Sequence, residues 1–174
     1  MCAITFEKSE VTKMMEEAIA YCSEKAGLGG KEQARKALQS GDCCVCEYMR
    51  HAMAQSMAEY LGSVDDTIKA VYTYEPEYAT SMDEPIPGRP NLSPGFNLIA
   101  RVSRKSAALS SVVASLRSAL ADECKRLGCC KANALCFELD VQVVDEGEVQ
   151  KRTGYGALIN SVYVRPLEVW SRYA

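Results

Sequence analysis

The apolar residues of this chain change their spacing once, near residue 66. Before that point they recur at steps of three and four residues, and after it they alternate in several segments. A period of 3.6 residues predicts an amphipathic helix and a period of two predicts a half-buried strand. The sequence therefore predicts a helical first part and a sheet that begins only after about residue 66.

Three helices are expected in the first part, over residues 9–26, 31–40 and 43–62, and a fourth over 105–127. A glycine stands at or just after the end of each segment, where helices commonly end: Gly27, Gly41, Gly62 and Gly128. The apolar stripe of the fourth helix consists of Leu109, Val112, Val113, Leu116, Leu120 and Leu127.

Four strands are expected, over residues 67–75, 96–103, 134–144 and 158–165. Alternation places Ile68, Ala70, Tyr72 and Tyr74 on one face of the first strand. In the third strand it buries Leu135, Phe137, Leu139 and Val141 and leaves Glu138 and Asp140 on the solvent side.

This order predicts an α+β fold in a single domain, 1–174, with a helical part (1–64) and a sheet part (65–174). A β-β-α-β-β unit would form one mainly antiparallel four-stranded sheet of two hairpin-like strand pairs, with helices on one face.

Charge is distributed unevenly along the chain, although the net charge is only −3. Residues 1–87 hold 8 Lys/Arg and 15 Asp/Glu, a balance of −7, and residues 88–174 hold 12 and 8, a balance of +4. Opposite surfaces can complement one another across a symmetry axis, so we expect a homo-oligomer, most simply a two-fold dimer.

Nucleic acid is a second possible partner of the basic half. Arg101, Arg104 and Lys105 cluster at a strand–helix junction, and Lys125 and Arg126 lie at the far end of the same helix. Such cations would contact phosphates. The pI of about 5.3 argues against this interpretation, because nucleic-acid-binding domains are usually basic.

Nine cysteines allow a thiolate or redox site. Cys43 and Cys46 have the Cys-x-x-Cys spacing of metal knuckles, and Cys129, Cys130 or Cys124 could complete four thiolates. No second Cys-x-x-Cys is present, and a free cysteine packs as a small apolar residue. We therefore expect core thiols, no bound metal and no cofactor.

No catalytic residue is predicted. The single histidine, His51, would have to serve every Ser–His or Cys–His pair, and no motif places a nucleophile beside it. Five of the six prolines lie in 76–94, and Arg89 near the tip of that segment is a candidate binding residue. The expected function is a non-catalytic binding or assembly module.

The chain has no apolar run of the length that a membrane span needs, and its first residues do not resemble a signal peptide. These features predict a cytoplasmic protein with no membrane partner.

Overall fold

The computed structural model describes residues 8–74, 95–128, 138–163 and 165–173, and within them the chain alternates between helices and a single sheet. The helices are α1 (Lys8–Lys25), α2 (Lys31–Ser40), α3 (Cys43–Val64), α5 (Ala107–Leu127), α6 (Glu146–Lys151) and α7 (Tyr155–Ile159). The strands are β1 (Ile68–Thr73), β2 (Phe96–Val102), β3 (Leu139–Asp145) and β4 (Leu167–Ser171). The protein has an α+β fold, as the sequence predicts.

The four long helical segments are confirmed, and local chemistry explains where they begin. The Asp42 side chain accepts a hydrogen bond from the Val45 amide at 3.0 Å and caps α3. Ser106 caps α5 in the same way through the Leu109 amide, at 3.1 Å. Gly41 takes the left-handed conformation that ends α2 (φ 76°). Only Gly41 and Asp42 separate α2 from α3.

The sheet is mixed, which corrects the expectation of a mainly antiparallel sheet built from two hairpins. Its strand order is β3-β2-β1-β4. β1 pairs antiparallel with both β2 and β4, whereas β3 runs parallel to β2. Since α5 carries the chain from β2 back along the sheet, β3 must enter in the same direction as β2. In this strand order β3 and β4 lie at opposite edges of the sheet and do not pair with each other.

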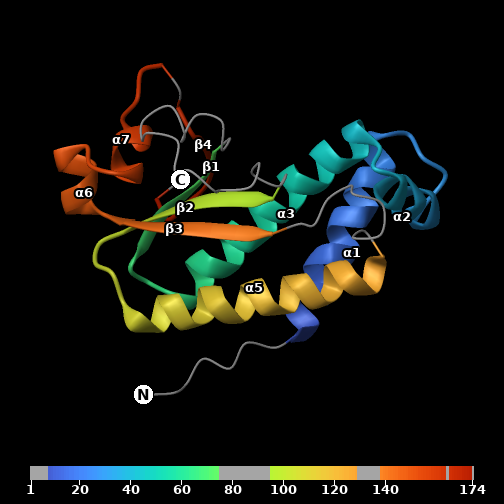
Figure 1. Cartoon of the computed structure of the whole chain (residues 1–174), viewed down its shortest axis with the longest axis horizontal. Coiled ribbons are helices and arrows are strands. Elements are labelled where there is room, and N and C mark those ends of the chain that lie inside the picture. Colours follow the sequence, from blue (N-terminus) through green and yellow to red (C-terminus); the bar gives the residue numbers. More distant parts are fainter. Residues whose placement is uncertain (1–7, 75–94, 129–137, 164, 174) are drawn as a thin grey trace, which may run out of the picture.

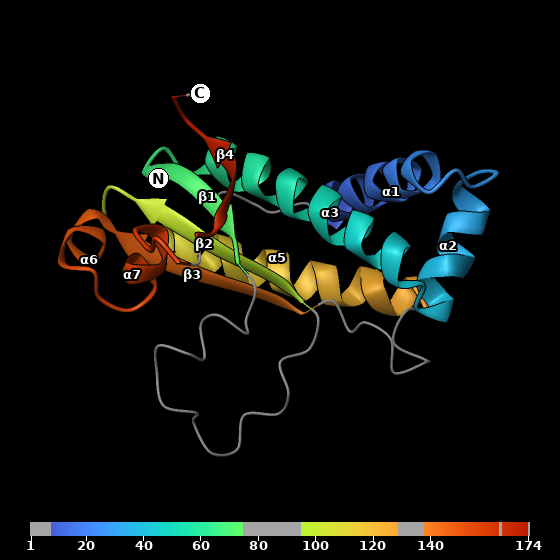
Figure 2. The same ribbon diagram turned by 90° about the horizontal axis from the view of Figure 1, so that it is seen from above.

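Helices pack against both faces of the sheet, so the expectation of helices on one face is wrong. The main core joins α1, α2, α3 and α5 to one face, through Phe96, Leu98, Ala100 and Val102 of β2 among others. A smaller cluster joins α6 and α7 to the other face. Figure 1 shows these two short helices at one end of the sheet, with α1 and α2 at the opposite end; Figure 2 shows the same arrangement from above.

The expectation that Ile68 and Ala70 share a face is also wrong. The register between β1 and β2 shifts between these two residues. Such a bulge inverts the alternation that follows it. Ile68 therefore belongs to the main core, whereas Ala70 and Tyr72 belong to the smaller cluster under α6 and α7.

The strand predicted over 158–165 is wrong. Residues 155–159 form α7, and Val162 and Tyr163 beyond it are 89% and 94% exposed. Leu158 and Ile159 are buried next to Tyr155, which is the i, i+3, i+4 spacing of a helix face. The real last strand begins after Pro166 rather than ending before it.

The third predicted strand is confirmed in its second half. Leu139 and Val141 are buried, Glu138 is exposed and Asp140 is half-buried, as the alternation predicts. Leu135 and Phe137 lie outside the described residues. Within the described part of the chain, no helix is long and apolar enough to cross a membrane.

Candidate functional site

Two of the predicted basic residues are held by acids of α6. The Arg101 guanidinium donates two hydrogen bonds of 2.9 Å to the Glu146 carboxylate, and this pairing raises the Arg101 pKa. Lys105 pairs with Glu148 at 2.7 Å. Arg104 is exposed and has no ionic partner among the described residues. Arg89 lies outside the described residues.

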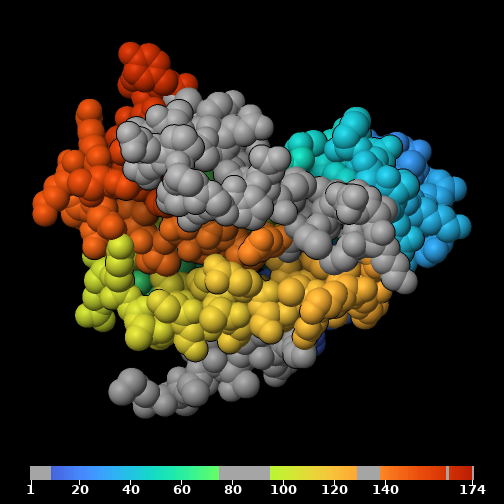
Figure 3. Space-filling view, viewed as in Figure 1, coloured from blue at the N-terminus to red at the C-terminus, as the bar shows by residue number. Residues whose placement is uncertain are grey.

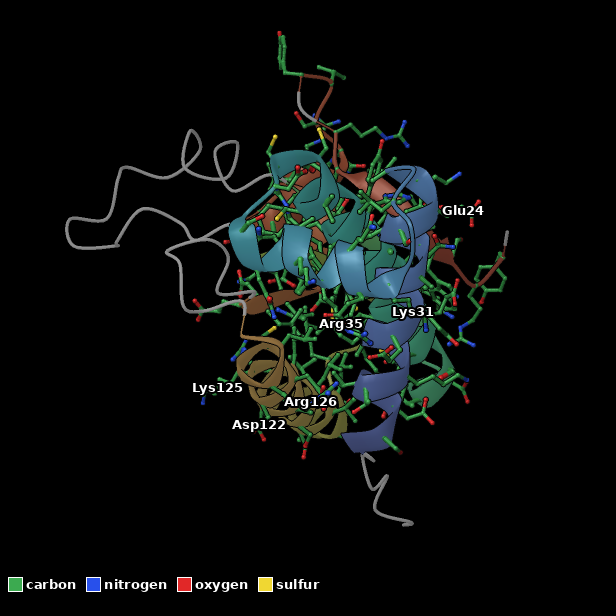
Figure 4. All side chains as sticks on the ribbon, turned by 90° about the vertical axis from the view of Figure 1, so that its right-hand side faces the viewer. Glu24, Lys31, Arg35, Asp122, Lys125 and Arg126 are labelled. Atoms are coloured by element: carbon green, nitrogen blue, oxygen red, sulfur yellow. The ribbon has the colours of Figure 1, made fainter. Side chains whose placement is uncertain are left out.

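The basic end of α5 is balanced in the same way. Figure 4 shows Lys125 and Arg126 with Asp122 beside them, and Lys31 and Arg35 on the neighbouring α2. Arg126 pairs with Glu123 at 2.7 Å, and both Arg35 and Lys31 pair with Glu16. Acids and bases alternate over this end, so its described residues form no continuous positive surface.

The two thiols of the predicted Cys-x-x-Cys pair have different environments. Cys46 is buried in the main core and Cys43 is exposed. The described residues hold no cluster of three or more potential metal ligands, while Cys129 and Cys130 lie outside them. Cys46 lies close to Cys22 of α1, and burial raises the pKa of the Cys22 thiol to about 11. Such a thiol is protonated at neutral pH and unreactive.

The strand β4 is the most exposed part of the sheet. It pairs with β1 on one side only, because it ends the strand order. Its five residues, Leu167–Ser171, contain one charged residue, Glu168, and no proline or lysine. Proteins usually protect such an edge with lysine, proline or a covering element. β4 has none of these residues within its length.

Exposed apolar side chains occur in β4 and close to it in sequence. The large hydrophobic residues exposed in the described part of the chain are Val162 (89%), Tyr163 (94%), Leu167 (58%) and Tyr173 (77%). The segment after α7 projects from the body of the molecule (Figure 3). The Tyr173 ring lies under the Lys69 ammonium, 5.4 Å from the ring centroid, so this tyrosine also contacts β1.

β4 is firmly attached to the molecule despite its exposure. Arg172 donates hydrogen bonds to the carbonyls of Ile68 (2.8 Å), Gly62 (2.7 Å) and Asp65 (3.1 Å). Trp170 packs directly over Gly62 of α3, where a side chain would overlap the indole ring. The free edge is therefore held in a fixed position, which reduces the entropy cost of pairing with another strand.

A pocket of about 210 Å³ lies beside the start of β4, between α3 and the ends of β1 and β2. Its helical wall is one stripe of α3, formed by Glu47, Arg50, His51 and Ala54, and its strand wall includes Tyr74, Phe96, Asn97 and Leu167. No sequence motif links these residues. The i, i+3, i+4, i+7 spacing of the α3 stripe was visible, but its strand partners come from three separate segments.

A hydrogen-bonded tyrosine forms part of this pocket. The Tyr74 hydroxyl donates to Asp140 at 2.9 Å, and Gln142 donates to both oxygens of the same carboxylate. Burial and the Asp140 charge raise the Tyr74 pKa well above its ordinary value. Tyr74 is therefore a neutral phenol whose hydroxyl already donates its hydrogen bond to Asp140. It fixes the shape of the strand wall and does not supply a reactive phenolate.

The chain matches no protein-family model, no curated protein and no solved structure.

Proposed function

We propose that this protein is a non-catalytic assembly module that pairs with a second copy of itself through β4. The observation that supports this proposal is the coincidence of two features. β4 ends the strand order of the sheet, so among the described residues it has a strand partner on one side only, and the exposed large apolar residues of the same part of the chain lie in β4 or near it in sequence. Backbone pairing would supply affinity, and the apolar flanks would exclude water.

A second copy fits this edge because antiparallel pairing of β4 with the partner's β4 is self-complementary. A two-fold axis between the strands closes the assembly at two copies. Pairing of β4 with the β3 edge of another copy would instead be head-to-tail, and such contacts form rings or open filaments. The two-fold arrangement would join two four-stranded sheets into one of eight strands.

The flanking side chains are large enough to support a stable dimer. Tyr163 and Tyr173 can each bury about 200 Å², or about 800 Å² over two copies. With Val162 and Leu167 added, the buried area passes the ~1,000 Å² that a specific interface needs. The single charge of β4, Glu168, adds little repulsion.

The other predicted activities find less support in the contacts. Arg101 and Lys105 are already paired with acids, and Cys43 and Cys46 do not share an environment. These contacts favour self-association over nucleic-acid binding or a thiolate site.

The test is the molar mass in solution, measured by light scattering at about 50 µM protein, well above the Kd of a typical interface of this size. The wild-type chain should show about twice its mass of 19.1 kDa. Tyr163→Asp should return the mass to that of one chain, because a carboxylate placed in an apolar interface loses its hydration. A chain near 19 kDa in the wild type contradicts the proposal.

A matched control separates the interface from the added charge. Ser118 is exposed in the middle of α5, so Ser118→Asp adds the same charge away from β4 and should leave the dimer intact. Tyr163 is 94% exposed, so its replacement should not disturb the fold. A Tyr163→Asp variant that remains dimeric would place the interface elsewhere.

A further inference from the structure

Two exposed thiols lie side by side at the start of α3. Cys43 and Cys44 are the first two residues of this helix, and both side chains are exposed. The other cysteines of the described chain, Cys22, Cys46 and Cys124, are buried in the main core, where a thiol packs as a small apolar group. The exposed pair contributes little to this core and is accessible to molecules in solution.

The two thiols are in contact with each other. The Cys43 and Cys44 side chains share a hydrogen bond, which is the largest of the effects that raise the pKa of Cys44. The negative charges of Asp42 and Glu47 add to this effect. Cys44 is therefore a protonated thiol at neutral pH, and its sulfur lies close enough to that of Cys43 for both to bind one atom.

The first turn of α3 holds this pair in position. The Asp42 side chain accepts from the Val45 amide at 3.0 Å, and the Asp42 carbonyl accepts from the Cys46 amide at 2.9 Å. Val45 and Cys46 are buried in the main core, so the turn is anchored on its inner side. When one sulfur has bonded to a ligand atom, the second is already beside it, which favours the second bond.

We infer that Cys43 and Cys44 form a binding site for trivalent arsenicals, in which an arsenic(III) atom carries one organic group and one oxygen. Each sulfur would form one As–S bond, and the arsenic–oxygen bond would break. The oxygen would leave as water with both thiol protons, and arsenic would remain in the +3 state, so the step needs no oxidant or reductant. Thiolates are soft ligands that select soft centres of this kind.

A pair of thiols suits this ligand better than it suits a structural metal. Structural zinc and iron–sulfur centres usually take four protein ligands. The described residues hold no group of three or more His, Cys, Asp or Glu side chains that could bind a metal ion. An arsenic(III) atom with one organic substituent needs only two sulfurs, which is the number that the start of α3 offers.

The site is remote from the proposed interface, so the inference does not depend on self-association. Gly62, near the other end of α3, is the residue that contacts Trp170 of β4. About 19 residues at 1.5 Å each separate Cys43 from Gly62 by about 28 Å along the helix. Figure 2 shows the start of α3 beside α2 and its end beside β4.

Phenylarsine oxide is the probe, and mass spectrometry of the intact native chain counts the arsenic groups that it retains in excess 2-mercaptoethanol. A monothiol competes poorly with two thiols on one chain, so the wild type should keep its arsenical, and 2,3-dimercaptopropanol should remove it. Cys43→Ser and Cys44→Ser should each lower the count by one. Both side chains are exposed, so these variants should fold as the wild type does.

Cys46→Ala is the matched control, because it removes a buried thiol of the same helical turn and leaves the exposed pair intact. Its count should equal that of the wild type. A count that Cys43→Ser or Cys44→Ser leaves unchanged, a count that Cys46→Ala lowers, or complete removal of the arsenical by 2-mercaptoethanol would overturn the inference.

Discussion

The contact between Gly62 and Trp170 shows how one missing side-chain atom positions the edge strand. A Cβ at Gly62 would overlap the Trp170 ring. The glycine therefore allows α3 and β4 to approach closely, and Arg172, stacked over the same ring at 5.3 Å, holds the strand there. The position of the proposed interface thus depends on a residue that is not part of it.

Gly62→Ala should lower the free energy of unfolding by about 1–3 kcal/mol, since a rigid ring and helix backbone must separate. Chemical denaturation would measure the loss. Ser63→Ala, at the exposed neighbouring position, should change it by less than about 0.5 kcal/mol. When Trp170→Leu is combined with Gly62→Ala, the alanine should lower the free energy of unfolding much less than it does in the wild-type chain. Strictly additive losses from the two substitutions would contradict this account.

The thiols should differ in reactivity according to burial. Cys43 and Cys44 are exposed, whereas Cys22, Cys46 and Cys124 are buried. With its pKa raised to about 11, Cys22 is a protonated thiol at pH 7.5 and cannot act as a nucleophile. Alkylation followed by mass spectrometry should modify the exposed pair at least about tenfold faster than the buried three. Equal rates would show that α3 opens readily.

At the scale of elements, the α6–α7 hairpin covers part of the second face of the sheet and is built from local signals. Asp145 accepts from the Glu148 amide at 3.0 Å, and Glu148 accepts from the Asp145 amide at 2.9 Å, a reciprocal capping box. The ion pairs Arg101–Glu146 and Lys105–Glu148 then attach the helix to β2 and the loop that follows it.

Asp145→Ala should reduce the free energy of unfolding by about 1 kcal/mol through loss of the cap. Asp66→Ala is a useful comparison, because Asp66 is 99% exposed and its contact with Arg172 is long, at 3.4 Å. That change should have an effect within about 0.5 kcal/mol. Urea denaturation would measure the free energy of unfolding of both variants. Equal reductions in the two would contradict the capping role of Asp145.

Elements with a long, regular pattern could be predicted from the sequence, and the others could not. The stripe of α5 spans 21 residues and is buried as expected. In residues 158–165 the apolar residues fit both the helical period of 3.6 and the strand period of two. The capping box and the short turn that favour a helix there precede this segment. The parallel entry of β3 and the bulge at Lys69 depend on sheet partners distant in sequence, so local periodicity does not encode them.

The candidate sites illustrate the same limit. The cluster of Arg101 and Lys105 was visible in the sequence, but the α6 acids that pair with it lie over 40 residues away. The edge β4 was missed because its five residues alternate weakly and follow a proline. A residue's chemistry is local, whereas its availability depends on the tertiary contacts around it.

At the scale of the whole molecule, several basic side chains of the described C-terminal half lie in ion pairs. Arg101, Lys105 and Arg126 each contact an acid. We expect no binding of a short labelled DNA duplex at about 0.15 M salt, where non-specific affinity depends on unpaired cations. Fluorescence anisotropy would detect it, and micromolar binding that weakens steeply with salt would contradict this expectation.

The central claim, that two copies pair through β4, can be measured by amide hydrogen exchange at two protein concentrations. Pairing would give the outward amides of Leu167–Ser171 hydrogen-bond partners, so their exchange should slow markedly from about 1 µM to about 100 µM protein. Exchange in β2, which is paired on both sides within one chain, should not change. Exchange in β4 that is independent of concentration, or slowing confined to the opposite edge at Leu139–Asp145, would contradict the account.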